Sequence, residues 1–162
     1  MIVSIIILVL VTVQRLGELV LARRNTARLL AQGGVETGAG HYPLIVGLHA
    51  AWLIGLFVVA WDRPVNWIWM GVFVLLQLAR VWVIASLGGR WTTRIVTVPG
   101  ETLVRRGPYR VVSHPNYMVV AAEIAVLPLA FGLFAYAVVF SILNAVVLAI
   151  RIRAESGVLS RT

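Results

Sequence analysis

The side chains best suited to bind or transform a ligand gather in one short run, Gly107-Pro-Tyr-Arg-Val-Val-Ser-His-Pro-Asn-Tyr117. A Pro directly after a His favours the start of a helix at that point. The free backbone amide groups of a helix start bind anions such as carboxylates, and tyrosine rings attract cations. The run is therefore compatible with a ligand site, and an interfacial turn with Tyr anchors is the alternative that its composition supports equally well.

A second cluster lies at the end of the last apolar stretch, where Arg151 precedes Glu155 by four residues. This spacing puts both side chains on one face of a helix. An Arg there can position a carboxylate or stabilise an oxyanion, whereas an ion pair that anchors the helix end is the alternative. The chain has no Cys, and its three His residues lack ligand spacing. We therefore expect no thiol nucleophile and no metal site.

These clusters belong to a chain that is unusually apolar for its size. Of 162 residues, 60% are hydrophobic and 12% charged, and the mean hydropathy of +0.95 is far above that of a soluble domain. All 14 basic residues are Arg, and they border apolar runs. This pattern suits membrane lipids as partners and argues against nucleic acid. We predict a single membrane domain, residues 1–162, without a separate soluble catalytic domain.

The apolar runs predict an all-α, polytopic membrane protein with about five transmembrane helices, because roughly 20 helical residues cross a bilayer. The predicted spans are 2–21, 43–61, 67–87, 116–131 and 132–150. The last two form a C-terminal hairpin that turns at Phe131-Gly132. Residues 23–41 are polar and Gly-rich, so we expect a loop there with about one helical turn. Residues 88–117 and 151–159 form the predicted ligand-binding segment.

Several polar residues lie inside the predicted spans, where each one needs a partner or has a function. Arg15 and Glu18 are three residues apart, which favours an ion pair turned inward. Arg80 in the third span needs a partner, and Glu123 in the fourth span is a candidate for that pairing. Glu123 is also a functional candidate because of its depth. We interpret His49 as a hydrogen-bonded residue of the helix core.

The run from 107 to 117 resembles the motif of the isoprenylcysteine carboxyl methyltransferase family and of its phospholipid N-methyltransferase relatives. The resemblance extends upstream to Leu87-Gly-Gly-Arg-Trp91 and Glu101-Thr-Leu-Val104. Downstream it includes Arg151-Ile-Arg-Ala-Glu155. It covers approximately residues 75–160, about half of the chain.

This resemblance implies S-adenosylmethionine as the cofactor, held over the cytoplasmic ends of the helices, with S-adenosylhomocysteine as its product. It implies that Arg151 faces the methyl acceptor as a catalytic and substrate-binding residue. Two positions depart from the family pattern, since Ser113 replaces an Arg and Ser156 replaces the second Glu of a common pair. The residues implied around the cofactor are Arg94, Glu101, Thr102, Leu103, Val104, Tyr109, His114, Pro115, Asn116, Tyr117 and Glu155.

The resemblance further implies methyl transfer to an oxygen of a lipophilic acceptor at the cytoplasmic membrane face. A carboxylate acceptor needs no base, whereas a phenol or enol needs one, and His114 is the nearby titratable residue. The motifs are also similar to a bacterial subgroup that O-methylates alkylpyrones or alkylresorcinols, and the composition fits a high-GC bacterium. The alternative functions are a membrane sterol-type NADPH reductase and a non-enzymatic membrane scaffold.

The arginines outside the spans predict the orientation of the chain. They follow the first, third and fifth spans, except for Arg63, which lies between the second and third. The positive-inside rule then puts the N-terminus outside and the C-terminus in the cytoplasm of the bacterial plasma membrane.

We therefore predict opposite locations for reporters at two sites of the chain. A reporter fused after Thr162 should be cytoplasmic, and one inserted at Arg63 should be external, because arginines are retained on the cytoplasmic side. Paired fusions to a fluorescent protein and to a phosphatase that is active only outside the cytoplasm measure both locations. Finding both sites on the same side of the membrane would contradict the predicted orientation.

Overall fold

The computed structural model describes residues 1–100, 102 and 104–159, except for the side chains of His41 and 154–159. The helices in this part of the chain are α1 (Ile2–Ala31), α2 (Tyr42–Ala60), α3 (Trp67–Leu87), α4 (Pro115–Ala130) and α5 (Phe134–Leu159). Short 3-10 helices are η1 (Ala39–His41), η2 (Gly88–Arg90) and η3 (Gly107–Arg110). A small antiparallel sheet pairs β1 (Val35–Thr37) with β2 (Ile95–Thr97), with Glu36 opposite Val96.

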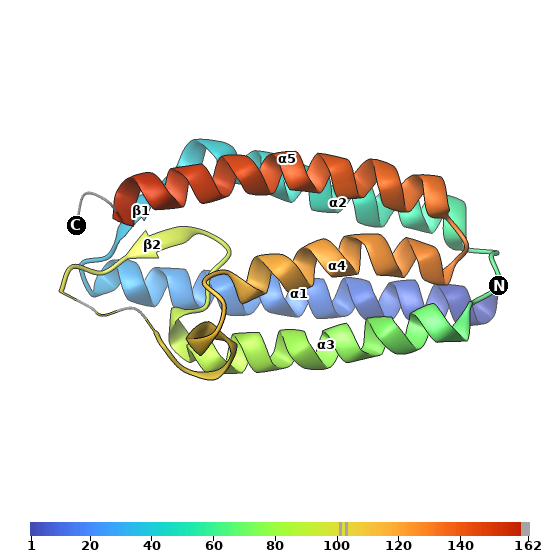
Figure 1. Ribbon diagram of the computed structural model, residues 1–162, viewed down its shortest axis with the longest axis horizontal. Helices are drawn as coiled ribbons and strands as arrows, with labels where there is room; N and C mark the ends of the chain where they lie inside the picture. The colour runs from blue at the N-terminus through green and yellow to red at the C-terminus, as the bar shows by residue number, and fades with distance from the viewer. Residues whose placement is uncertain (101, 103, 160–162) are drawn as a thin grey trace.

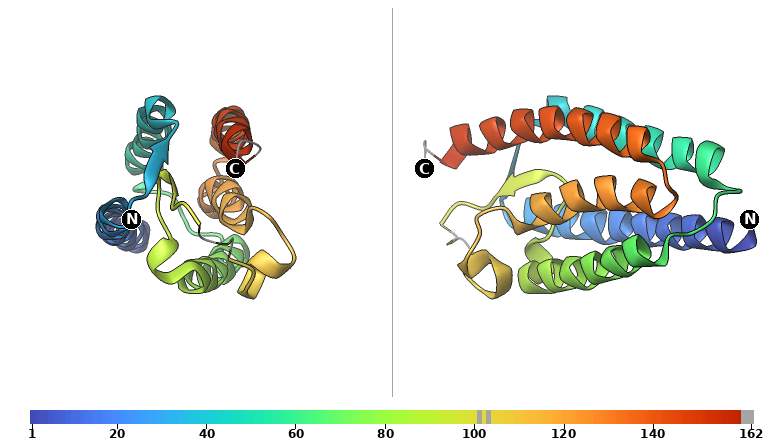
Figure 2. Two further views of the ribbon diagram at one scale, coloured as in Figure 1. Left: turned by 90° about the vertical axis from the view of Figure 1, so that its left-hand side faces the viewer. Right: turned by 45° about the vertical axis from the view of Figure 1, so that its right-hand side comes forward.

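The α-helices run side by side along the long axis of the molecule (Figure 1). Viewed end-on, they follow a ring in the order α1, α2, α5, α4, α3 (Figure 2). The sheet, η3 and the C-terminal part of α5 lie at one end of this bundle, whereas α1 begins at the other end (Figure 1). The bundle therefore brings the segment between α3 and α4 to the same end as the last turns of α5.

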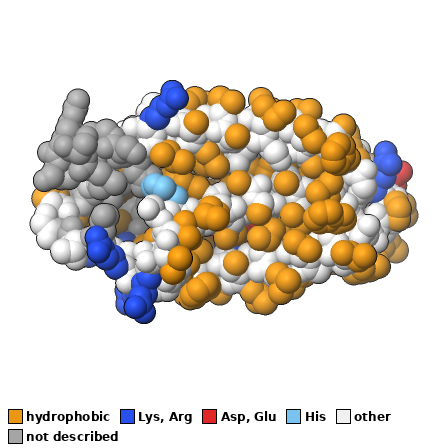
Figure 3. All heavy atoms as spheres, viewed as in Figure 1, with side chains coloured by type: hydrophobic (Ala, Val, Ile, Leu, Met, Phe, Trp, Pro, Cys, Tyr) orange, Lys and Arg blue, Asp and Glu red, His pale blue; other side chains and the backbone are white. Residues whose placement is uncertain are grey.

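The outer surface of the bundle is the surface of a membrane protein. Four of the helices, α1, α2, α3 and α5, are long and apolar enough to cross a membrane, and α4 is a shorter apolar helix of 16 residues. Hydrophobic side chains cover the helical part of the face in Figure 3, whereas basic side chains lie toward its ends. Large apolar side chains point outward, as Ile68 does with 80% exposure. Lipid solvates such side chains, so the chain is an all-α, polytopic integral membrane protein.

Local signals explain where three of the helices begin or end. Asn66 caps α3, because its Oδ1 accepts from the backbone N–H of Ile68 at 3.1 Å and of Trp69 at 3.3 Å. Pro115 occupies the first turn of α4, where its missing N–H costs no hydrogen bond. Gly132 has a φ of +70°, and it makes the turn between α4 and α5.

The expected loop over residues 23–41 is wrong in its first part, because α1 continues to Ala31. Tertiary contacts stabilise this extension. Asn25 is only 6% exposed, and its Nδ2 donates to the carbonyl oxygen of Trp91 at 2.8 Å. Leu29 is also buried. The polar sequence therefore continues as a helix because it packs on the segment that follows α3.

A ring of four charges joins α1, α3 and α4 inside the bundle. Arg80 Nη2 lies 2.6 Å from Glu18 Oε2, and Arg80 Nη1 lies 2.9 Å from Glu123 Oε2. Arg15 contacts the same two carboxylate oxygens, at 3.0 Å for Glu18 and 2.8 Å for Glu123. The predicted pairs Arg15–Glu18 and Arg80–Glu123 are both confirmed.

Two glutamines extend this ring and satisfy further lone pairs. Gln77 Nε2 donates to Glu123 Oε1 at 2.8 Å, and Gln14 Nε2 donates to Gln77 Oε1 at 2.7 Å. The charges of the two Arg and two Glu cancel, while Glu123 is only 1% exposed. Removal of one partner from a buried pair leaves an uncompensated charge, which is the costly outcome.

We predict that Glu123→Ala lowers the free energy of unfolding by about 3–5 kcal/mol, because Arg15 and Arg80 lose their shared partner. Thermal unfolding in detergent, followed by circular dichroism, measures this change. The control Glu36→Ala breaks the more exposed ion pair with Arg94, in which Nη1 lies 2.9 Å from Oε1. That control should cost less than about 1 kcal/mol. Equal destabilisation by the two substitutions would contradict the stabilising role of the ring.

Candidate functional site

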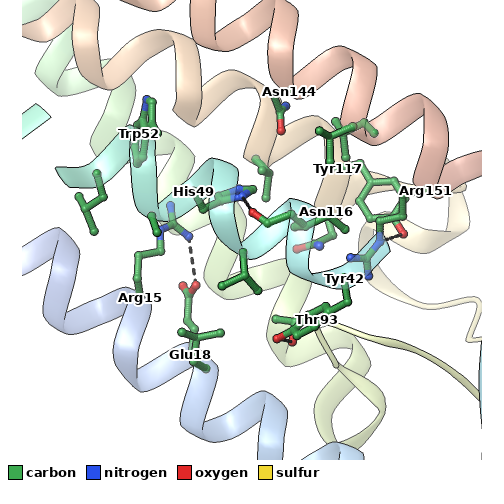
Figure 4. A pocket seen from close by; sticks show the side chains of 18 of the residues that line it. Arg15, Glu18, Tyr42, His49, Trp52, Thr93, Asn116, Tyr117, Asn144 and Arg151 are labelled. Atoms are coloured by element: carbon green, nitrogen blue, oxygen red, sulfur yellow. Dashed lines mark hydrogen bonds and ion pairs between the residues drawn. The ribbon is translucent and has the colours of Figure 1, made fainter. Parts of the chain in front are cut away.

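A cavity of about 280 Å³ lies between α1, α2, α4, α5 and the segment 91–93 (Figure 4). Much of its wall is apolar, with Leu53, Val120 and Val147 among the lining residues. Such a cavity suits a lipophilic ligand whose orientation is set by a few polar groups. The polar residues that border it are Thr12, Arg15, Glu18, Tyr42, His49, Arg80, Thr92, Thr93, Asn116, Tyr117, Asn144 and Arg151.

Arg151 and Tyr117 meet at the wall of this cavity, one from α5 and one from α4. Arg151 Nε donates to Tyr117 Oη at 2.7 Å, and Cζ of Arg151 lies 5.2 Å from the centroid of the Tyr117 ring. Arg151 is 8% exposed, and no acidic side chain within the described part of the chain pairs with it. Its positive charge is therefore held in a fixed position and is available to a negatively charged group of a ligand.

The start of α4 brings the histidine motif to the same region. The rings of His114 and Tyr117 stack with their centroids 5.1 Å apart and their planes 9° from parallel. Asn116 lines the cavity, whereas His114 and Pro115 do not. The buried Asn116 Oδ1 lacks a hydrogen-bond partner within the described residues. The motif thus supplies one side of the cavity through Asn116 and Tyr117, with His114 packed behind Tyr117.

Other predicted cofactor residues lie outside the cavity lining. Arg94 contacts Glu36, and its guanidinium carbon lies 4.6 Å from the centroid of the Tyr42 ring. The carbonyl oxygen of Thr102 accepts from Arg90 Nη1 at 2.7 Å. Neither residue lines the cavity, and the same holds for Val104 and Tyr109.

Three predicted cofactor residues fall outside what the structure describes. Glu101 and Leu103 belong to positions that it leaves out, and Glu155 belongs to α5 but its side chain is not described. Their proposed contacts with a cofactor stay predictions.

The cavity also has polar residues that were not among the predicted site residues. His49 forms the expected hydrogen bond, with Nδ1 2.8 Å from the carbonyl oxygen of Ile45, but it borders the cavity as well. Tyr42 Oη, at the start of α2, lies 3.2 Å from Thr93 Oγ1, and both residues line the cavity. Asn144 is 2% exposed on α5. A single amide within the apolar run of α5 was the sequence signal that could have identified it.

The charge ring of α1, α3 and α4 closes one side of the cavity, because Arg15, Glu18 and Arg80 are among its lining residues. These groups are already paired with one another. Arg151 has Tyr117 as its partner and no acidic partner within the described residues, so it is the cation best placed to attract a negatively charged oxygen. The arrangement can therefore hold a lipophilic molecule with its oxygen at the Arg151 end.

Comparisons with known proteins give two matches. The model of the isoprenylcysteine carboxyl methyltransferase (ICMT) family matches residues 69–161. The chain is also 38% identical over 160 residues to the uncharacterized protein YpbQ of Bacillus subtilis (strain 168), with 95% of each chain covered. No solved structure matches with significance. The matched range contains both the 107–117 run and Arg151.

Proposed function

The chain belongs to the isoprenylcysteine carboxyl methyltransferase family and is a membrane methyltransferase, and we propose that it uses S-adenosylmethionine to methylate an oxygen of a lipophilic acceptor. The observation that carries this proposal is the contact of Arg151 with Tyr117 at an apolar cavity. An apolar cavity holds the hydrocarbon part of an acceptor, and a cation with no acidic partner among the described residues attracts its reactive oxygen.

The residues around the start of α4 fit S-adenosylmethionine. Asn116 has a buried oxygen that can accept a hydrogen bond from a ligand. Pro115 opens α4, and the positive end of the helix dipole at this point is suited to a carboxylate. The stacked rings of His114 and Tyr117 offer an aromatic surface for a cation or an adenine ring. These four residues would hold the cofactor, together with the sequence-predicted Glu155.

S-adenosylmethionine, when bound, supplies a methyl group on a sulfonium that an oxygen can displace. Arg151 orients the acceptor oxygen and stabilises its negative charge, and Tyr117 keeps the guanidinium in place through its hydroxyl. The apolar wall excludes water from the reacting oxygen, which strengthens the attraction to Arg151. A carboxylate reacts in this position without a base. A phenol or enol would have to pass its proton to a base, for which His114 is the candidate, while Arg151 favours the anionic oxygen that results.

The proposed reaction takes place at the cytoplasmic membrane face. The distribution of arginines favours a cytoplasmic location for the end of the bundle that carries the sheet and η3. In this orientation the cofactor arrives from the cytoplasm of the bacterial cell. The acceptor, a lipid or lipid-like molecule, enters the cavity from the bilayer between helices.

We predict that His114→Ala weakens binding of S-adenosylhomocysteine by about 1–3 kcal/mol, because a half-buried polar and stacking partner is lost. Isothermal titration calorimetry of the purified protein measures this affinity. The control Val111→Ala changes a side chain that is 88% exposed in the same segment, and its affinity should equal that of the parent. Parent-like binding by His114→Ala would remove His114 from the cofactor site.

We predict that Arg151→Ala lowers the rate of methyl transfer by about 10²–10³, the usual cost of losing a preorganised group that stabilises an oxyanion. Affinity for S-adenosylhomocysteine should stay close to that of the parent, because Arg151 acts on the acceptor. Arg151→Lys should recover little activity, since an ammonium group cannot reproduce the planar fork of Arg.

The matched control is Arg153→Ala, which removes an exposed arginine two residues further along α5. Its turnover should remain within about threefold of the parent, because most surface substitutions have small effects. Both variants are assayed with labelled S-adenosylmethionine and a panel of a prenylcysteine analogue, an alkylresorcinol and an alkylpyrone. Normal turnover of every accepted substrate by Arg151→Ala would assign Arg151 to membrane anchoring alone.

A further inference from the structure

Three buried polar side-chain atoms have no hydrogen-bond partner within the part of the chain that the structure describes: Trp91 Nε1, Asn116 Oδ1 and Asn144 Oδ1. All three belong to residues that line the same cavity. Buried polar groups in native proteins are normally paired, and leaving one unpaired costs about 1–3 kcal/mol. Their shared location indicates that a polar part of a ligand completes their hydrogen bonds.

Asn144 differs from the other two because the proposed cofactor contacts do not account for it. Trp91 follows η2, and Asn116 belongs to the start of α4, so both lie within the predicted ligand-binding segment. Asn144 instead precedes Arg151 by seven residues on α5. This separation is about two helical turns, or about 10 Å, and it leaves both residues on the same face of the helix. Asn144 therefore lies further from the cofactor end than Arg151 does.

The surroundings of Asn144 make an unpaired amide especially unfavourable. The residue is 2% exposed, and α5 is one of the helices able to cross the membrane. Water is scarce at such a depth, so an unsatisfied amide cannot rely on solvent. The amide points into the cavity that His49, Asn116 and Tyr117 also border (Figure 4). A ligand bound in the cavity is therefore the group that can hydrogen-bond to the Asn144 amide.

The unpaired atom of Asn144 is its amide oxygen, which accepts a hydrogen bond, so the matching ligand group is a neutral donor such as a hydroxyl. Helical side chains generally lean toward the N-terminus of their helix, which for Arg151 is the direction of Asn144. A single compact head group can therefore reach both residues. A lipid with one terminal oxygen function and only hydrocarbon beyond it would leave the Asn144 amide unpaired.

We propose that Asn144 determines acceptor specificity by accepting a hydrogen bond from a second oxygen function, a hydroxyl, on the same lipid whose first oxygen faces Arg151. This inference rests on the proposed function and narrows its acceptor to lipids whose head group has two oxygen functions. Asn144 contacts the acceptor away from the reacting oxygen. Substitution of Asn144 therefore changes which acceptor is preferred, and it leaves Arg151 and the residues proposed to bind the cofactor unchanged.

The test compares two probes that differ in one hydroxyl, a 5-alkylresorcinol and the 3-alkylphenol with the same chain. The wild-type protein should favour the resorcinol in kcat/KM. Asn144→Leu should lower kcat/KM for the resorcinol by about 10- to 100-fold, which corresponds to losing one buried hydrogen bond. Its kcat/KM for the phenol should change by less than about threefold, and so should the affinity for S-adenosylhomocysteine.

The control Leu143→Ala alters a neighbouring side chain that is 46% exposed on α5, and it should leave the preference between the probes unchanged. Equal losses on both probes, or an unchanged preference in Asn144→Leu, would overturn the proposed role. If the protein methylates a prenylcysteine analogue but neither phenolic probe, the proposed function stands and the Asn144 proposal fails. Failure to methylate any of the three probes would count against both.

Thermal unfolding without any acceptor provides an independent readout. An unpaired buried amide contributes no stability, so Asn144→Leu should unfold at the same temperature as the parent or at a higher one. A structural amide would behave in the opposite way. A clear fall in the unfolding temperature of Asn144→Leu, with Leu143→Ala unaffected, would therefore overturn the proposal.

Discussion

Within the hydrocarbon core of a membrane, a polar group has no water to bond, so it must find its partner inside the protein. The ring of Arg15, Glu18, Arg80 and Glu123 meets this requirement for α1, α3 and α4. Because each carboxylate accepts from both guanidinium groups, displacing one of these helices would leave a charge unpaired. The ring therefore fixes α1, α3 and α4 relative to one another. Three of its residues, Arg15, Glu18 and Arg80, also line the cavity.

In the cavity, by contrast, some buried polar groups find no hydrogen-bond partner within the described residues. Arg151 has a phenol for its partner and no acidic partner within the described residues, and the amide oxygens of Asn116 and Asn144 have none there. The contrast with the fully paired ring supports the proposal that the cavity is a binding site. A family of membrane methyltransferases gives this site a chemical role. In the proposed function, the apolar wall of the cavity would hold the acceptor and Arg151 would direct its oxygen.

The sequence predicted much of the fold, because the lengths of the apolar runs set the helices; the range 67–87 coincides with α3. It did not predict the extension of α1 to Ala31, which depends on Asn25 reaching the segment after α3. The resemblance to the family named Asn116, Tyr117 and Arg151, and the structure brings these three to one cavity. The contact between Arg15 and Glu123, 108 residues apart, depends on tertiary packing that no local pattern encodes. The position of Asn144 in the cavity wall also depends on tertiary packing, so it could not be predicted from the sequence.

The central claim is that this membrane protein transfers a methyl group from S-adenosylmethionine to a lipid oxygen. It is tested most directly with the wild-type protein in lipid vesicles, S-adenosylmethionine carrying an isotopically labelled methyl group, and the acceptor panel described above. Mass spectrometry of the extracted lipids should locate the label on an oxygen of at least one acceptor, and NADPH in place of S-adenosylmethionine should give no product. Absence of label from every acceptor, together with oxidation of NADPH, would contradict the account.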